Sequence, residues 1–392
     1  MRRSASRSIA AICMSAGVVL AIPSPVLADL VFLEPGSSPA GNRPAGMAVA
    51  DFNHDGLLDV VAANDQLSTA SVLLGTGTTR FAPVVSYATA PDGRIFHHPQ
   101  PLATGDFNGD GNLDYAVTSQ YGGPFYVSVA LGVGNGTFLA QTLHQVGTCP
   151  TSVVAVDTNH DGRLDLITTN SEGSNISVLL GNGNGTFQPR TEFESDDSPI
   201  SNVSADFNGD GHADIAQVSW GVGRLTILLG AGNGQFGAPT HYTVGANPRS
   251  LVAADFNHDG IADIAVANGE GASISVVKGY GDGSFAPAIE YPLSSAGWVD
   301  SEPNSIIAVD LDADGNLDLA VADFRMAAVE VFRGSANGIF GLPQIIPLGT
   351  SPSTIATADF NADGSPDLAV LDYESGSLAV LINDVVFNGS FD

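Results

Sequence analysis

Cysteine is almost absent from this 392-residue chain, which contains only Cys13 and Cys149. Because Cys13 lies in an N-terminal segment that we expect to be removed, no intramolecular disulfide can form. Basic residues are also scarce: 13 lysines and arginines face 42 aspartates and glutamates, for a formal net charge of −29. Such a surface repels nucleic acid and anionic membranes at long range, so we expect no nucleic-acid partner. The chain is nevertheless 44% hydrophobic, so it is not a disordered acidic tail.

Long apolar runs are missing as well, apart from Ile9 to Ile22 near the N-terminus. Arginines at positions 2, 3 and 7 precede that run, and the small residue Ala28 stands before Asp29. This is the layout of a secretory signal peptide over residues 1–28, cleaved after Ala28. The run is shorter than the roughly 20 residues that a membrane-spanning helix needs. We therefore predict a protein without a membrane span that is secreted, periplasmic or held at the cell surface.

One nine-residue pattern, D-x-[ND]-x-D-G-x-x-D, occurs seven times in the rest of the chain. The copies begin at Asp51, Asp106, Asp157, Asp206, Asp255, Asp310 and Asp359. A proline stands seven residues before each copy, at Pro44, Pro99, Pro150, Pro199, Pro248, Pro303 and Pro352. Glycine-rich turns that end in phenylalanine follow six of the copies, at Phe81, Phe138, Phe187, Phe236, Phe285 and Phe340. These landmarks indicate one structural unit that is copied along the chain.

The segments around each copy are typical of strands rather than helices. They are four to seven residues long, rich in Val, Ile and Thr, and separated by Gly, Asn and Pro. Each repeat has four of them: one enters the acidic motif, one leaves it, one precedes the glycine turn and one follows the phenylalanine. The sequence therefore predicts an all-β, seven-bladed β-propeller with four antiparallel strands per blade.

The two ends of the repeat region predict how the ring closes. Val31–Pro35 resembles Gln235–Pro239, which we assign to an outermost strand. We expect this N-terminal strand to close the last blade, whose other strands run from about Thr354 to Asn383. Sharing one blade between both chain ends hides edge strands that would otherwise pair with other chains. The propeller domain should span residues 29–384, and residues 385–392 form an unassigned tail.

The acidic motif has the donor set of a calcium loop. Side-chain oxygens at positions 1, 3, 5 and 9 and the carbonyl of position 7 can surround one cation, and the glycine at position 6 allows the sharp turn. All-oxygen ligands in a flexible loop favour Ca²⁺ over Mg²⁺. We predict up to seven structural calcium ions, with these ligands: Asp51, Asn53, Asp55, Leu57, Asp59; Asp106, Asn108, Asp110, Asn112, Asp114; Asp157, Asn159, Asp161, Arg163, Asp165; Asp206, Asn208, Asp210, His212, Asp214; Asp255, Asn257, Asp259, Ile261, Asp263; Asp310, Asp312, Asp314, Asn316, Asp318; Asp359, Asn361, Asp363, Ser365, Asp367.

Two other interpretations of the motif are weaker. A metal-free Asp/Asn-rich turn could explain one copy. It does not explain seven, because clustered carboxylates repel by roughly 1 to 4 kcal/mol per pair and a turn needs no such cluster. An EF-hand needs a bidentate Glu at position 12 and flanking helices, but position 12 of the first copy is Ala62. Calcium would then stabilise this secreted chain where others use disulfides.

These residues resemble the FG-GAP or VCBS repeat family over nearly the whole chain after residue 28. Phe236–Pro239 resembles its Phe-Gly and Gly-Ala-Pro signature, and Ala254–Gly260 resembles its calcium loop. The resemblance implies a seven-bladed propeller with calcium between the first and second strands, as in integrin α subunits and integrin-like fungal lectins. The signature is incomplete in most units, so the similarity is nearer to secreted bacterial VCBS proteins. Family members bind proteins or glycans and some propellers belong to polysaccharide-acting enzymes, so the resemblance leaves the function open.

Departures from the repeat indicate where a ligand could bind. Insertions near Ala90–His98, Ser119–Phe125 and Ser294–Glu302 are all expected on the face opposite the calcium loops. The residue before each proline should face the channel mouth there, and it varies: Arg43, His98, Cys149, Ser198, Asn247, Glu302 and Ser351. We predict a ligand site built from Arg43, His98, Tyr121, Trp220, Trp298, Glu302, Arg325 and Tyr373. Solvated strand ends and tolerated surface insertions are the alternative.

No catalytic motif accompanies these residues. The adjacent His97 and His98 do not converge readily on one metal, and no second residue is indicated to activate Cys149 as a nucleophile. The sequence predicts a monomeric, non-catalytic binding module for a glycan or an extracellular protein. A carbohydrate-active enzyme, either a lyase or a hydrolase with its site at the channel mouth, is the alternative. A purely structural extracellular protein is the third possibility.

Overall fold

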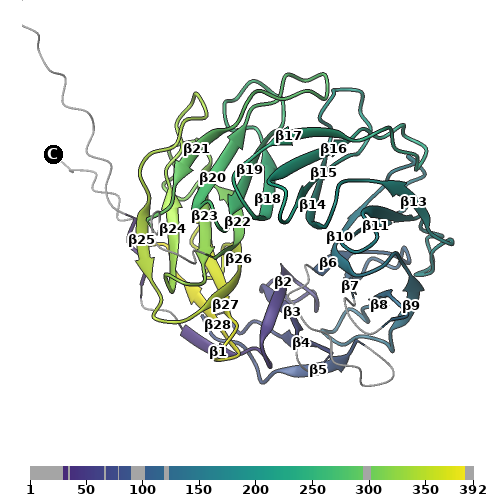
Figure 1. Ribbon diagram of the computed structural model, residues 1–392. Helices are drawn as coiled ribbons and strands as arrows, with labels where there is room; N and C mark the ends of the chain where they lie inside the picture. Colours follow the sequence, from purple (N-terminus) through teal and green to yellow (C-terminus); the bar gives the residue numbers. More distant parts are fainter. Residues whose placement is uncertain are drawn as a thin grey trace, which may run out of the picture. The chain divides into compact units, whose positions relative to one another are not determined.

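The computed structural model describes residues 30–33, 36–65, 68–77, 79–89, 102–118, 123–294 and 302–384. Within these ranges the chain forms 28 strands and no helix, organised as seven four-stranded antiparallel sheets. Figure 1 shows these sheets as the blades of a ring. The prediction of an all-β, seven-bladed propeller is confirmed. Across the described segments, no helix has the length and apolar composition that crossing a membrane would require.

The first six blades follow the order of the chain, and each begins with its innermost strand. Blades 1 and 2 comprise β2 (Pro44–Ala50), β3 (Asp59–Asn64), β4 (Thr69–Leu73), β5 (Val85–Ala88), and β6 (Leu102–Gly105), β7 (Asp114–Thr118), β8 (Tyr126–Ala130), β9 (Thr142–Gln145). Blades 3 and 4 comprise β10 (Pro150–Val156), β11 (Asp165–Asn170), β12 (Asn175–Leu179), β13 (Thr191–Glu194), and β14 (Pro199–Ala205), β15 (Asp214–Ser219), β16 (Arg224–Leu228), β17 (Thr240–Thr243). Blades 5 and 6 comprise β18 (Pro248–Ala254), β19 (Asp263–Asn268), β20 (Ser273–Val277), β21 (Ile289–Pro292), and β22 (Pro303–Val309), β23 (Asp318–Asp323), β24 (Ala328–Phe332), β25 (Gln344–Pro347).

The seventh blade combines both ends of the described chain. It consists of β26 (Pro352–Ala358), β27 (Asp367–Asp372), β28 (Ser377–Leu381) and the N-terminal β1 (Gly36–Pro39). β1 pairs antiparallel with β28, so that Gly36 lies opposite Val380 and Pro39 lies opposite Ser377. Closure by an N-terminal strand is therefore confirmed.

The predicted position of that closing strand, Val31–Pro35, is wrong. Phe32 forms an isolated bridge to Asn383, as Phe81 does with Gly75 in blade 1. Phe32 is thus the counterpart of the turn phenylalanines, and the outer strand begins four residues after it. Phe236 has the same relation to β17, because a short irregular segment separates the phenylalanine from the strand.

A side chain of blade 6 holds the segment that precedes β1. The amide of Gln344 accepts a hydrogen bond from Leu30 N–H at 3.1 Å and donates one to the Leu30 carbonyl at 2.7 Å. The side-chain amide of Gln344 thereby makes the two hydrogen bonds that the backbone of a neighbouring strand would otherwise make.

Local sequence explains the strand pattern of the blades. The second strands are buried along their whole length, because neighbouring blades cover both of their faces. They accordingly read as apolar runs such as Val60–Ala63. Proline opens six innermost strands, β2, β10, β14, β18, β22 and β26, as predicted. A strand tolerates its missing N–H at that first position.

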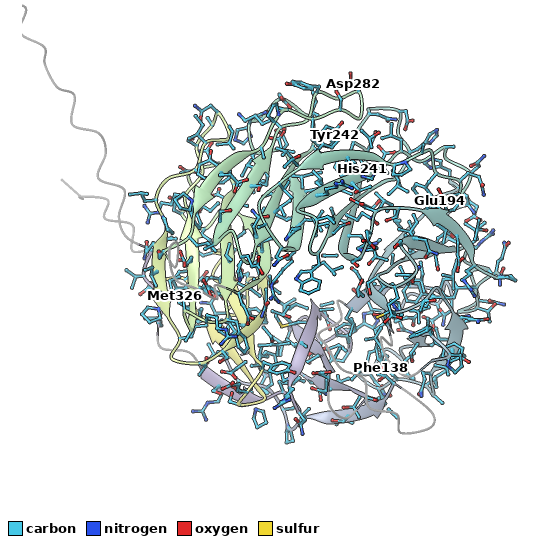
Figure 2. All side chains as sticks on the ribbon, in the orientation of Figure 1. Phe138, Glu194, His241, Tyr242, Asp282 and Met326 are labelled. Carbon is cyan, nitrogen blue, oxygen red and sulfur yellow. The ribbon has the colours of Figure 1, made fainter. Side chains whose placement is uncertain are left out.

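The hydrophobic core of the described residues divides into seven clusters, and each cluster joins two neighbouring blades. Phe138, which Figure 2 labels, lies in the cluster between blades 1 and 2. Its ring packs edge-on against Phe52 at 5.8 Å and Tyr87 at 5.7 Å from blade 1, and against Tyr115 at 4.8 Å within blade 2. The turn phenylalanine of a blade is therefore inserted into the preceding blade, which explains its regular recurrence.

Candidate functional site

Each acidic motif forms the loop between the first and second strands of its blade. In blade 1, Asp51 Oδ1 accepts hydrogen bonds from the N–H groups of Asn53 at 3.3 Å and Asp55 at 3.2 Å. Asp51 Oδ2 accepts one from Gly56 N–H at 2.9 Å, and this bond to the motif glycine recurs in all seven loops. The first aspartate therefore organises the loop around its own carboxylate.

The glycine at position 6 is required by its backbone conformation. Its φ lies between 78° and 91° in all seven loops, a left-handed region that side chains disfavour. A Cβ atom would meet nothing within 4 Å at any of these positions. Open space surrounds the glycine, so the turn alone explains its presence.

The ninth-position aspartates are buried and bind the backbone. Asp59 Oδ2 accepts a hydrogen bond from Phe52 N–H at 2.9 Å, and its Oδ1 accepts one from Gly75 N–H at 2.7 Å. Equivalent pairs of bonds occur in the other six blades. Burial raises the pKa of all seven carboxyls, that of Asp114 to about 6 and that of Asp318 to about 7. Each of these residues ties the acidic loop to the turn after the third strand.

The loop of blade 6 has the most concentrated charge. Carboxylate oxygens of Asp310, Asp312 and Asp314 lie within 4.8 Å of one another, the one such group of three found among the described residues. An all-oxygen cluster of this size fits a hard cation such as Ca²⁺ at positions 1, 3 and 5. Asp318, the predicted ligand at position 9, is not part of the group, and backbone N–H groups already engage both of its oxygens. Arg333 Nε lies 3.7 Å from Asp312 Oδ2 and offsets the additional charge.

A cavity of about 930 Å³ occupies the channel at the end opposite the acidic loops. Its wall consists mainly of the innermost strands, and its rim includes Ser171, Asp197 and Trp220. Trp220 is 53% exposed, which is high for an indole and leaves a face available for stacking. The cavity therefore lies on the face where the sequence predicted a ligand site.

Hydroxyl groups line this cavity in a ring. The third residue of the innermost strand is a serine or threonine in five of the six blades where it is described: Ser152, Ser201, Ser250, Ser305 and Thr354, with Gly46 in blade 1. Several of these hydroxyls also join neighbouring blades. Thr354 Oγ1 donates to the Ala45 carbonyl at 2.8 Å, and Ser152 Oγ donates to Asn202 Oδ1 at 2.7 Å. Hydroxyl and amide groups thus dominate the polar part of the wall.

Arg249 is the only basic residue among the described residues that line the cavity. Its guanidinium lies 3.5 Å from Glu302 and 3.3 Å from Asn304, both in blade 6. Arg325 approaches the same carboxylate at 3.3 Å, so two arginines share one glutamate through long contacts. Gly269 makes room for this arrangement, since a Cβ there would lie 2.9 Å from Arg249 Nε.

The predicted ring of residues before the prolines has a structural role. The carbonyl of each described member accepts a hydrogen bond from the residue that follows the second strand, for example Ser198 from Trp220 N–H at 3.0 Å. Among these members, Cys149 and Ser198 line the cavity and Arg43, Asn247, Glu302 and Ser351 do not. The residues before the prolines therefore form the same backbone turn in each blade, and they do not form a continuous ligand surface.

Of the remaining predicted ligand residues, four lie in two places in the structure and three lie outside the described residues. Tyr373 donates a hydrogen bond to Asp65 at 2.5 Å, and Arg43 lies over its ring at 5.3 Å, so these residues cluster with one another beside blade 1. Burial raises the pKa of Tyr373 to about 12, and the Asp65 carboxylate contributes to the increase. Glu302 and Arg325 reach the cavity wall through Arg249. His98, Tyr121 and Trp298 lie outside the described residues, as do His97 and the predicted signal peptide.

Sequence reasoning missed Arg249, Asn202 and the ring of hydroxyls. The recurrence of Ser or Thr two positions after the proline could have indicated the ring. Arg249 could have been noticed as the only arginine or lysine among the residues that directly follow the seven prolines.

Comparison with known families identifies a match over most of the chain. The FG-GAP-like repeat matches residues 51–117, 106–168, 157–217, 206–266, 255–321 and 310–370. Among curated proteins, no sequence is significantly similar to this chain.

Solved structures share the fold at low sequence identity. BBS1N, solved in complex with ARL6DN, is 13% identical, with a TM-score of 0.62 over 91% of this chain and 98% of that one. A lectin from Agrocybe aegerita that recognises non-reducing terminal N-acetylglucosamine is 18% identical, with a TM-score of 0.53 over 85% and 86%. The periplasmic gluconolactonase of Pseudomonas aeruginosa is 15% identical, with a TM-score of 0.59 over 84% and 88%. These similarities support the propeller fold and leave the activity open.

Proposed function

Because the chain belongs to the FG-GAP-like repeat family, we propose that it is a secreted, calcium-loaded binding module that takes a glycan into the cavity at the channel mouth. The propeller would span residues 29–384 after removal of residues 1–28. The observation that carries the proposal is the cavity wall, which combines a ring of hydroxyls with Arg249 and the exposed Trp220. Sugar hydroxyls pair with such groups, and an indole stacks on the apolar face of a pyranose ring.

A glycan fits this face better than a protein partner does. Protein interfaces are built around apolar anchors that a flat or convex surface presents. Among the described residues, the large exposed hydrophobic side chains other than Trp220 and Val222 belong to the outer strands, the glycine turns, the segments between these two, or the N-terminal segment. A concave site of about 930 Å³ instead accommodates one or a few sugar units.

Calcium has a structural role in this proposal. The loops lie at the end of the innermost strands opposite the cavity, so a bound ion would not touch the ligand. The ion would instead fix one end of each innermost strand, and the opposite end of that strand forms the cavity wall. Removing calcium should therefore weaken ligand binding only indirectly, by destabilising the propeller.

A glycan array probed with the calcium-saturated protein tests the function. We expect binding that Trp220→Ala and Arg249→Ala each reduce at least about tenfold, the loss expected for one stacking or charged contact. Tyr280→Ala and Arg190→Ala are matched controls, because both residues lie away from the cavity. The proposal would be refuted if the protein bound no glycan on the array, or if the control variants lost as much glycan binding as Trp220→Ala and Arg249→Ala. Release of unsaturated or reducing sugars from a polysaccharide panel would favour the enzyme alternative instead.

A further inference from the structure

In three acidic loops the fourth residue is a histidine whose side chain reaches the next blade. His54 Nε2 lies 3.1 Å from Asn112 Oδ1, and His258 Nε2 lies 3.2 Å from Asn316 Oδ1. In each case the partner is the seventh residue of the following loop. Between blades 3 and 4 that partner is another imidazole: His160 Nε2 lies 2.7 Å from His212 Nδ1.

The backbone fixes the position of both imidazoles. His160 has a φ of 57°, close to the 60° of His54 and the 61° of His258, so the three loops present the side chain in the same way. The His212 ring lies over Gly232, where a Cβ would come within 2.5 Å of Nδ1. His212 N–H also donates to Asp210 Oδ1 at 2.8 Å. The two rings meet at a tilt of 49° with their centroids 4.9 Å apart, and His160 is exposed to solvent.

Two imidazole nitrogens at this separation are close to chelating geometry. Nitrogen ligands at about 2.0–2.1 Å from one tetrahedral zinc ion lie roughly 3.3 Å apart, so the rings would have to separate by roughly 0.6 Å and turn to admit a metal between them. Imidazole nitrogen prefers zinc, copper and nickel, whereas the carboxylates and carbonyls of the acidic loops suit calcium. The strongly acidic surface raises the local concentration of any divalent cation.

We propose that His160 and His212 form a binding site for a late first-row divalent metal ion of the zinc type, which bridges blades 3 and 4. Both side chains bind the ion through ring nitrogens, and water completes its coordination. The site is separate from the predicted calcium site of the same loop, to which His212 would contribute its backbone carbonyl. It is also independent of the proposed glycan function.

Isothermal titration with Zn²⁺, in buffer that keeps the calcium loops saturated, tests the site. His160→Ala and His212→Ala should each weaken the tightest zinc binding at least about tenfold, because a single imidazole cannot chelate. The repeat supplies matched controls: His54→Ala and His258→Ala remove histidines at the same loop position whose partners are asparagines, and both should leave that affinity unchanged. His212→Ala keeps the backbone carbonyl, and equal melting temperatures in calcium show that the variants are folded.

A second measurement identifies the ligands directly. With Cu²⁺ as the probe, electron paramagnetic resonance should reveal coupling to two imidazole nitrogens in the wild type and to fewer in His160→Ala. The inference is overturned if the wild type binds no zinc in the presence of calcium. It is equally overturned if His54→Ala and His160→Ala lose the same affinity, or if the copper spectrum is unaltered by the substitution.

Discussion

Phe52 of blade 1 packs edge-on against Phe138 of blade 2, with 5.8 Å between the ring centroids. The same contact recurs around the ring, between Phe107 and Phe187 at 5.7 Å, Phe207 and Phe285 at 5.5 Å, and Phe256 and Phe340 at 5.4 Å. One phenylalanine comes from the acidic loop of a blade and the other from the glycine turn of the next. Blades therefore depend on their neighbours for burial of these rings.

Phe138→Ala should lower the free energy of unfolding by about 3–5 kcal/mol, the usual cost of truncating a buried phenylalanine. Its ring contacts Phe52, Tyr87 and Tyr115, so the cavity left behind cannot collapse easily. Chemical denaturation with calcium present measures the change. Phe81→Ala is the matched control with a smaller expected loss, because Phe81 is less buried and packs against Phe360 at a longer 6.3 Å. Equal losses at the two positions would contradict this explanation.

Tyr115→Phe should not destabilise the protein and should stabilise it by about 1 kcal/mol or more. The Tyr115 side chain is fully buried, its hydroxyl has no hydrogen-bond partner among the described residues, and burial raises its pKa. Aliphatic residues such as Val60 and Leu166 occupy the equivalent position in other blades. Thermal unfolding of the variant beside the wild type measures the effect. A clear loss of stability would mean that the hydroxyl has a partner.

His144 should contribute a loss of stability as the pH is lowered through 6.5. Burial lowers the pKa of His144 below its ordinary value of 6.5, and its ring packs against Phe187 at 5.1 Å. The unfolded chain therefore binds a proton below pH 6.5 while the folded chain resists it, so protonation favours unfolding. His144→Tyr introduces the residue that blades 1, 4 and 5 have at this position, and it should remove part of the pH dependence. Denaturation midpoints at pH 7.5 and 5.5 compare the two proteins, and an unchanged difference would rule out His144.

Chelation should lower the melting temperature if the acidic loops hold calcium. At about 2 mM free ion, one site with a dissociation constant of about 0.1 mM adds roughly 1.8 kcal/mol. Melting curves in calcium and in EDTA measure the shift, with magnesium as the control ion. Indistinguishable curves would contradict calcium loading.

The calcium effect should also increase with pH. Burial raises the pKa of Asp114 to about 6 and that of Asp318 to about 7 when no metal is bound. Such groups stabilise the metal-free fold below pH 4 by retaining protons, and this contribution is lost as the pH rises through 6 to 7. A dication offsets the buried charge, so the difference between the calcium and EDTA curves should be larger at pH 8 than at pH 5.

The repeat made the fold predictable, because each landmark has a local physical cause. The glycine at position 6 follows from a single backbone angle, and the proline follows from the start of a strand. The boundary of β1 could not be predicted in the same way. Three residues separate Phe32 from the strand, and only the pairing of Gly36 with Val380 establishes which residues form it.

The site was less predictable because it depends on which blades face one another across the channel. Trp220 could be proposed from its place on the correct face, and it does line the cavity. Arg249 could not, because its orientation depends on the space above Gly269 and on Glu302 in the next blade. Tyr373 was expected to face a ligand, but it is engaged by Asp65 and Arg43, which the sequence places more than 300 positions away.

The closing strand has a consequence for biosynthesis. The hydrogen bonds between Leu30 and Gln344 join residues 314 positions apart, and β1 finds its partner β28 only when the last repeat has been made. An emerging chain must therefore keep its first strand unpaired during almost the whole of translation, and the unpaired backbone groups of that strand can meanwhile pair with the wrong partner. A chain that stops before residue 377 lacks β28, so β1 has no partner and the ring of blades cannot close. Such a truncated protein should be prone to aggregation.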